Sequence, residues 1–191
     1  NTGRATVEGS SVLSNTATSG GGFYSVSSGQ LTISASTVVS NSAADRGGGI
    51  AIAQAGSVLT LTNNSLVQDN VAGATGGGID NWEAATRVES SRVYSNTAFR
   101  GGGIANDFGQ LTVDASSVHF NTATDAGGGV WSNGGTVSLV SGTTVQSNGA
   151  DVGGGLFNQT SSVMVLDAST VATNTAMTRG GGIGNAGGVV T

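Results

Sequence analysis

The sequence predicts an all-β solenoid, in which the chain winds in coils and each coil stacks on the one before. Three glycines followed by a large apolar residue occur seven times, at intervals of 25 to 29 residues. A fixed period in this range with small insertions is the signature of a repeat architecture. Abundant Val, Thr and Gly disfavour helix. The first glycines of the seven motifs are Gly20, Gly47, Gly76, Gly101, Gly127, Gly153 and Gly180.

Other positions repeat in register with the glycines. Each coil has an asparagine before its triplet, an alanine two residues after that asparagine, and a valine three residues before it. A Ser or Thr precedes each valine by two positions. The asparagines are Asn15, Asn41, Asn70, Asn96, Asn121, Asn148 and Asn174. The valines are Val12, Val38, Val67, Val93, Val118, Val145 and Val171.

Three short strands are expected in each coil. The first begins at the apolar residue after the glycines, the second is an alternating segment such as 31–33, and the third is the Ser-x-Val segment. Alternation with period two places one side of a strand inside and the other outside. Besides the valines, two inward columns are expected. One runs from Phe23 to Ile183, and the other contains Val7, Ile33, Leu61, Val88, Val113, Leu139 and Leu166.

The columns predict how neighbouring coils hold together. Parallel strands of successive coils would pair at a spacing of about 4.8 Å. The asparagines would form an internal ladder at a turn, each side chain bonded to its equivalents above and below. The glycines would hold left-handed or closely approaching backbone at a tight corner, and the alanines would stand where only a methyl group fits.

Composition excludes several functions. Only 9% of the residues are charged, lysine is absent and the net charge is -5, which argues against nucleic acid as a partner. No apolar run is long enough to insert into a membrane. The absence of cysteine excludes disulfides and thiolate metal sites, and suits a secreted protein stabilised without bridges. Because the chain begins at Asn1 without Met, we expect a processed or excised piece.

The repeat resembles that of the chlamydial polymorphic outer membrane proteins, which carry Gly-Gly-Ala-(Ile/Leu/Val) and Phe-x-x-Asn. The present chain has Gly-Gly-Gly-(Phe/Ile/Leu/Val) and Val-x-x-Asn in all seven coils. The resemblance implies a right-handed parallel β-helix on a cell surface, in an adhesin or an autotransporter passenger. It implies no active site. The wider β-helix class also contains pectate lyases and polygalacturonases, so an enzyme is the alternative.

One group of residues is a candidate site for a glycan or a protein partner. Asp125 and Asp151 each stand two residues before a glycine triplet in adjacent coils, where stacking would place them roughly 5 Å apart, near the spacing of a retaining glycosidase pair. Trp131 and Phe157 follow the motif in the same coils and are expected to point outward as an exposed aromatic pair. Stacking brings any two equivalent residues this close, so we predict contact residues and no catalytic ones.

Other chemistry finds little support in the sequence. His119, the one histidine, is expected to face solvent rather than a catalytic serine. Four of the seven coils carry no acid near the glycine turn, so neither a metal nor a cofactor is expected. Arg46, Arg100 and Arg179 precede their glycines and could pair with neighbouring acids. Charged residues interrupt the Thr-x-Thr positions, which makes ice binding a poor third hypothesis.

The main hypothesis is a structural β-helix outside the cell or on its surface, a stalk or filament segment that is not an enzyme. Its alternative is a polysaccharide-binding or polysaccharide-cleaving protein, a lyase or a hydrolase. Residues 1–191 would form a single repeat domain, a segment of a longer chain or a fibre subunit. The chain opens within a repeat, since Asn1-Thr2-Gly3 resembles Asn185-Ala186-Gly187, and closes within one. End-to-end association of subunits is therefore expected.

Overall fold

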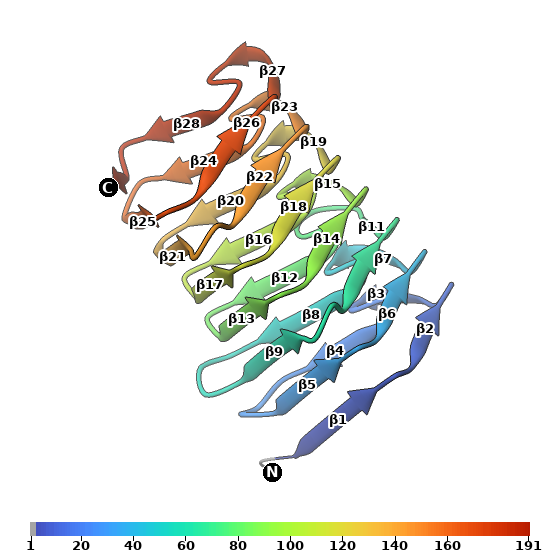
Figure 1. Ribbon diagram of the computed structural model, residues 1–191. Coiled ribbons are helices and arrows are strands. Elements are labelled where there is room, and N and C mark those ends of the chain that lie inside the picture. Colours follow the sequence, from blue (N-terminus) through green and yellow to red (C-terminus); the bar gives the residue numbers. More distant parts are fainter. Residues whose placement is uncertain (1–2) are drawn as a thin grey trace.

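The computed structural model describes residues 3–191 as a β-solenoid of about seven turns. Among these residues there is no helix, and therefore none long and apolar enough to cross a membrane. Figure 1 shows the coils rising in sequence order from the N-terminal to the C-terminal end. The predicted parallel solenoid is confirmed. Asn1 and Thr2, which belong to the expected partial repeat, lie outside the described residues.

Sheets A and B contain the two segments expected upstream of the asparagine. Sheet A consists of β1 (Arg4–Glu8), β5 (Gln30–Ser34), β9 (Val58–Thr62), β13 (Ala85–Glu89), β17 (Gln110–Asp114), β21 (Gly135–Val140), β25 (Ser162–Leu166) and β29 (Val189–Val190). Sheet B consists of β2 (Ser11–Leu13), β6 (Thr37–Val39), β10 (Leu66–Gln68), β14 (Arg92–Tyr94), β18 (Ser117–His119), β22 (Thr144–Gln146) and β26 (Thr170–Ala172). Every pairing between these strands is parallel.

Each coil has four strands, and the expectation of three was wrong. The additional one leads from the asparagine to the glycine triplet and forms sheet C, whereas sheet D follows the triplet. Sheet C consists of β3 (Thr16–Ser19), β7 (Ser42–Arg46), β11 (Val71–Ala72), β15 (Thr97–Arg100), β19 (Thr122–Ala126), β23 (Gly149–Val152) and β27 (Thr175–Arg179). Sheet D consists of β4 (Phe23–Ser25), β8 (Ile50–Ala53), β12 (Ile79–Trp82), β16 (Ile104–Asp107), β20 (Val130–Asn133), β24 (Leu156–Gln159) and β28 (Ile183–Ala186). Sheet C has only alanine as a regular inward residue, so no large apolar column marks it.

The three predicted apolar columns form the core. In sheet B each valine stands opposite the next, as Val67 does to Val93, and the five central valines are fully buried. The central residues of the columns in sheets A and D are buried to the same degree, as Leu61 and Ile79 show. All three columns belong to one hydrophobic cluster. Apolar side chains therefore run through the solenoid without interruption.

The predicted asparagine ladder stands between sheets B and C. The backbone N–H and Nδ2 of Asn70 both donate to Oδ1 of Asn96, each over 3.0 Å. Nδ2 of Asn70 also donates to the carbonyl of Val38 in the coil below, over 2.9 Å. The same pattern repeats at each step from Asn15 to Asn174. The ladder thus satisfies buried polar groups that would otherwise destabilise the corner.

A second internal ladder stands where sheet D leads into sheet A, and the sequence analysis missed it. Nδ2 of Asn81 donates to Oδ1 of Asn106 over 2.7 Å, and Nδ2 of Asn158 to Oδ1 of Asn185 over 3.1 Å. The sequence does contain a pattern that indicates this ladder, because these four asparagines all lie two residues after the apolar residue of their motifs. Ser25, Ile52 and Ser132 occupy this position in the other coils, so the column is irregular.

Candidate functional site

The outward side of sheet D is largely covered, because the ends of the sheet C strands lie over it. Ala51, Asp80, Ala105 and Trp131 are successive outward residues in paired strands, yet all four are buried. We call this region the corner surface and define it by the residues whose side chains meet there. They are Arg46, Asp80, Trp82, Arg100, Asp125, Trp131, Phe157 and Gln159.

The glycine triplet makes this covering possible. The first glycine of each triplet has a left-handed backbone, with φ of 66° at Gly127. A methyl group built on Gly127 would lie 2.7 Å from Cβ of Trp131, so any larger residue would clash. Glycine therefore lets the chain fold back closely enough for the end of sheet C to lie against sheet D.

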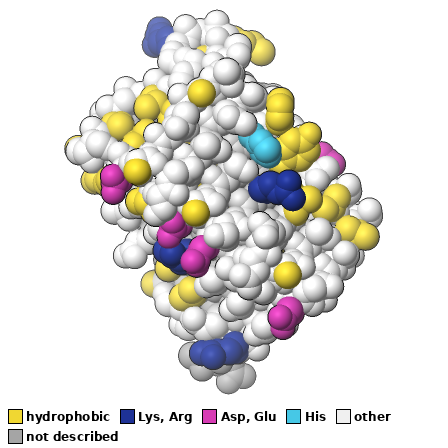
Figure 2. Space-filling view, viewed as in Figure 1, with side chains coloured by type: hydrophobic (Ala, Val, Ile, Leu, Met, Phe, Trp, Pro, Cys, Tyr) yellow, Lys and Arg dark blue, Asp and Glu magenta, His cyan; other side chains and the backbone are white. Residues whose placement is uncertain are grey.

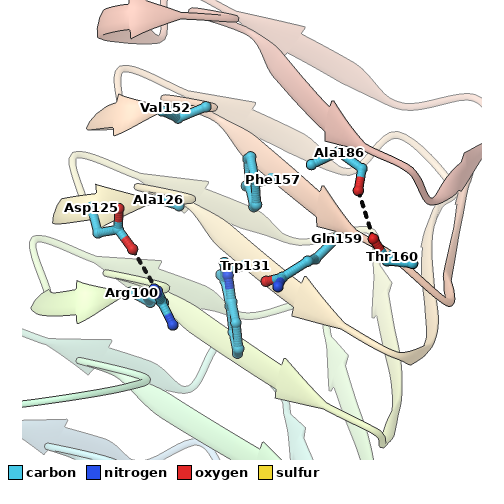
Figure 3. Close-up of a pocket in the computed structure, with 9 residues that line it drawn as sticks. All are labelled: Arg100, Asp125, Ala126, Trp131, Val152, Phe157, Gln159, Thr160 and Ala186. Atoms are coloured by element: carbon cyan, nitrogen blue, oxygen red, sulfur yellow. Dashed lines mark hydrogen bonds and ion pairs between the residues drawn. The ribbon is translucent and has the colours of Figure 1, made fainter.

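A pocket of about 320 Å³ opens on the corner surface at the fourth to seventh coils, and Figure 3 shows its side chains. It contains three of the four predicted contact residues. The lining consists of Arg100, Asp125, Ala126, Trp131, Val152, Phe157, Gln159, Thr160 and Ala186. Sheets C and D and the turn after β24 contribute these residues.

Trp131 and Phe157 are neighbours, as expected, since β20 pairs with β24 at this position. The prediction that they form an exposed pair was wrong for Trp131, which is only 4% exposed. It packs with Ala105 and Ala126, and the half-buried Phe157 lies against this cluster. The guanidinium carbon of Arg100 lies 5.7 Å from the centre of the indole. Outward orientation from sheet D therefore does not mean contact with solvent.

Trp131 also has an unpaired donor. Its Nε1 atom is buried and has no hydrogen-bond partner among the described residues. In Figure 3 the indole lies beneath Phe157 and next to the Gln159 side chain, at the floor of the pocket. The indole N–H of a buried tryptophan usually finds an acceptor. The pocket thus offers a hydrogen-bond donor, the indole N–H of Trp131, to a ligand.

The two predicted carboxylates differ in their surroundings. Oδ2 of Asp125 accepts a 2.5 Å hydrogen bond from Nε of Arg100, and both side chains are partly exposed. Asp151 is not among the residues that line the pocket. It lies in β23, whose register against β19 shifts between Thr122 and Ala126. The pocket therefore contains one predicted carboxylate, which is already paired with an arginine.

A second pocket, of about 240 Å³, lies on the same corner surface at the first three coils. Its distinctive residue is Asp80, which is 1% exposed. Burial raises the pKa of Asp80 to about 7, although a 2.6 Å hydrogen bond from Thr75 and the charge of Arg46 oppose the shift. Asp80 was not predicted as a site residue from the sequence, because strand alternation places it outward and does not reveal that sheet C covers it.

The two pockets share a local arrangement. In each, an arginine that precedes a glycine triplet lies over a tryptophan of the next coil, and Arg46 is 5.3 Å from the centre of Trp82. Nε of Arg46 lies 3.7 Å from Oδ2 of Asp45, and Nη1 of Arg46 lies 4.0 Å from Oδ2 of Asp107. Arg46 and Arg100 therefore pair with acids as expected. No ion pair of Arg179 occurs among the described residues.

The other faces of the solenoid carry an ion-pair cluster around Arg87 on sheet A and an aromatic cluster on sheet B. Figure 2 shows mostly uncharged side chains, with an apolar group beside the histidine and scattered charged residues. His119 is half-buried in sheet B, with its ring 4.9 Å from Tyr94 and 5.5 Å from Phe120. Partial burial, and secondarily the charge of Arg92, lower the pKa of His119. Within residues 3–191, no three His, Cys, Asp or Glu side chains come together to hold a metal ion.

No protein-family model matches the chain, and comparisons with curated proteins and with solved structures found no match. The resemblance to polymorphic outer membrane proteins therefore depends on the repeat motifs alone. Functional inference has to start from the geometry of this chain.

Proposed function

We propose that the chain is a structural β-solenoid, a stalk or filament segment presented outside a cell or on its surface, and that it is not an enzyme. The observation that supports this most is the uniformity of the interior. The same valine column and asparagine ladder pass through the central coils without a break. Because every coil is hydrogen-bonded to its neighbours, the coils form one continuous rod, which suits a stalk or a filament segment.

The surroundings of the candidate carboxylates also favour a structural role. Cleavage of a glycosidic bond generally requires two carboxyl groups that face one substrate across about 5 to 9.5 Å. In the larger pocket, Asp125 is paired with Arg100 and Asp151 is not part of the lining. The coils of 25 to 29 residues also leave no long insertion that would build the walls of a cleft.

The location can be tested with antibodies raised against the purified solenoid. They are expected to label intact cells of the source organism, and brief protease treatment of those cells should remove the label. An antibody against a cytoplasmic protein is the control for cell integrity. Labelling that requires permeabilised cells would contradict the proposal.

The proposal includes protein partners at the ends of the rod. The strands of the first described coil, β1 to β4, pair only with the second coil, and Val7 is only partly buried. At the other end Met177 and Ile183 are exposed. Such edges can accept further strands, either from additional coils of a longer solenoid or from a second copy.

A further inference from the structure

We propose that the pocket around Trp131 binds an uncharged saccharide, with the indole N–H of Trp131 donating a hydrogen bond to a sugar oxygen and Phe157 packing against the sugar ring. This inference goes beyond the structural role. It concerns a ligand of the corner surface and does not depend on where the solenoid is located.

The first step is the unpaired donor. Nε1 of Trp131 is buried without a partner among the described residues, although the other polar groups of the pocket are engaged or exposed. A buried donor without an acceptor is destabilising, and native proteins contain few such groups. An acceptor supplied by a ligand would remove this cost.

The second step is access. Trp131 forms the floor of the pocket, and the side chains of Arg100 and Gln159 lie around it. The Gln159 side chain is partly exposed and makes no hydrogen bond among the described residues, so it can rotate away from the indole while the Arg100–Asp125 ion pair stays intact. A ligand therefore reaches Nε1 when Gln159 moves aside, and the backbone of sheets C and D stays in place.

The third step is the chemistry of the lining. Arg100 and Asp125 neutralise each other, and hydrogen bonds join them and join Thr160 to the carbonyl of Ala186. A charged ligand would have to compete with the internal ion pair. An uncharged ligand that both donates and accepts hydrogen bonds can instead use Trp131, Gln159 and the outer atoms of the ion pair.

The fourth step is shape. A pocket of about 320 Å³ lies at the lower end of the range for small-molecule sites, which are concave, lined mainly by hydrophobic and aromatic side chains, and carry a few placed polar groups. Phe157 supplies a half-buried aromatic face beside the unpaired N–H. A sugar ring presents an apolar face of C–H groups and an edge of hydroxyl groups, so it matches both. These four observations together favour an uncharged saccharide.

Isothermal titration calorimetry of the whole chain tests the proposal. The uncharged probes are cellohexaose, xylohexaose, mannohexaose and the fully N-acetylated chitin hexamer, and the charged probes are hexagalacturonic acid and chitosan hexamer. We expect at least one uncharged probe to bind saturably and the charged probes to bind at least tenfold more weakly. Trp131→Phe keeps an aromatic ring and removes the N–H, and it should weaken binding about tenfold, as the loss of one hydrogen bond predicts.

Phe157→Ala should weaken binding to a similar degree, and Tyr94→Ala, on sheet B, is the matched aromatic control that should bind as the wild type does. Trp131→Phe breaks no hydrogen bond of the free protein but places a smaller side chain at a buried position, so its melting temperature and circular dichroism spectrum are measured first to show that the fold is retained. The proposal is overturned if no uncharged probe binds at about 1 mM, if only charged probes bind, or if either Trp131→Phe or Phe157→Ala binds as tightly as the wild type. The cell-labelling result is independent of each of these outcomes.

Discussion

Oγ1 of Thr75 donates a 2.6 Å hydrogen bond to Oδ1 of Asp80, a carboxyl group that the ends of sheet C bury almost completely. Burial raises the pKa of Asp80 to about 7 from an ordinary value of 3.8, and neither Thr75 nor the charge of Arg46 cancels the shift. Asp45 and Asp107 add to it through their negative charges. Asp80 therefore links the stability of the solenoid to pH.

The first prediction concerns this linkage. Below pH 4 Asp80 is protonated in both the folded and the unfolded chain, so its ionisation does not change the free energy of unfolding. Between about pH 4 and 7 the unfolded chain releases the proton more readily, so the Asp80 contribution lowers the free energy of unfolding by on the order of 4 kcal/mol in total. Above pH 7 the loss is complete. Asp80→Asn removes this contribution and should stabilise the protein most at pH 8.

Urea unfolding of wild type and Asp80→Asn at pH 4, 6 and 8 measures the effect. Asp69→Asn is the control, because Asp69 is exposed and lies outside the corner surface. The stability gain of Asp80→Asn over wild type should grow from pH 4 to pH 8, whereas that of Asp69→Asn should show no such increase. A gain that is the same at all three pH values would show that Asp80 is ionised normally in the folded chain.

The second prediction is that the chain does not cleave polysaccharides. We expect neither new reducing ends nor unsaturated products from polygalacturonate, alginate or the uncharged hexasaccharides, because Asp125 is held by Arg100 and Asp151 does not line the pocket. Asp125→Asn, Asp151→Asn and Asp80→Asn serve as the matched variants. Product that forms with the wild type and disappears in one of them would assign the chain to the lyases or hydrolases.

Much of the fold could be predicted from the sequence, because periodic columns determine the register directly. Once Val67 and Val93 are aligned, the asparagine ladder and the glycine corner follow from the same spacing. The strand of sheet C was not predictable in this way. Segments such as Thr16–Ser19 contain no large apolar residue, so their pairing depends on the coil geometry rather than on a local pattern.

The candidate site was predictable only in part. Alternation along sheet D correctly placed Trp131 and Phe157 side by side on its outward side. It could not reveal that the ends of sheet C cover that side, which buries Trp131 and Asp80. Burial of this kind arises from the angle between two sheets, and that angle depends on the close approach of the glycine backbone rather than on side-chain periodicity.

The third prediction concerns the asparagine ladder. Oδ1 of Asn96 accepts two hydrogen bonds from Asn70, and its Nδ2 donates to Val67 and Asn121, all at 3.0 Å. Asn96→Ala removes all four bonds and leaves buried partners unpaired, so it should lower the free energy of unfolding by about 3 to 5 kcal/mol. Urea unfolding is the measurement.

Asn15→Ala is the matched control for Asn96→Ala. The Asn15 side chain is exposed and donates one bond, to Oδ1 of Asn41 over 3.0 Å, and the backbone N–H of Asn15 still reaches that oxygen. Its replacement should lower the free energy of unfolding by about 1 kcal/mol or less. Similar losses in the two variants would mean that the ladder contributes little to the central coils.

The fourth prediction concerns end-to-end association. Val7 faces the interior at the first described coil and stands opposite Ile33, and within residues 3–191 β1 pairs with no other strand than β5. Val7→Arg places a charge where a further coil or second copy would pack, so it should abolish concentration-dependent association in sedimentation equilibrium. Thr6→Arg introduces the same charge on the outward side of β1 and should associate as the wild type does. A wild type that remains monomeric at all concentrations would contradict the prediction.

The fifth prediction separates the role of the third glycine in a central coil from its role in the last described coil. A methyl group on Gly103 would lie 2.6 Å from the carbonyl oxygen of Gly129 and 2.9 Å from Nδ2 of Asn121. Neither neighbour can move freely, because one is backbone and the other belongs to the ladder. Gly103→Ala should therefore lower the free energy of unfolding by about 1 to 3 kcal/mol, the range for overpacking a close contact.

Gly182 occupies the same position of the motif in the last described coil, where a methyl group would meet only Cγ1 of Val171, at 3.6 Å. Gly182→Ala should be neutral, or stabilising by about 0.4 to 1 kcal/mol, because alanine restricts the unfolded chain more than glycine does. Urea unfolding at low protein concentration compares the two variants. Equal destabilisation would show that the third glycine is required by its own backbone conformation. A difference in the expected direction would show that the close stacking of the next coil requires glycine at this position.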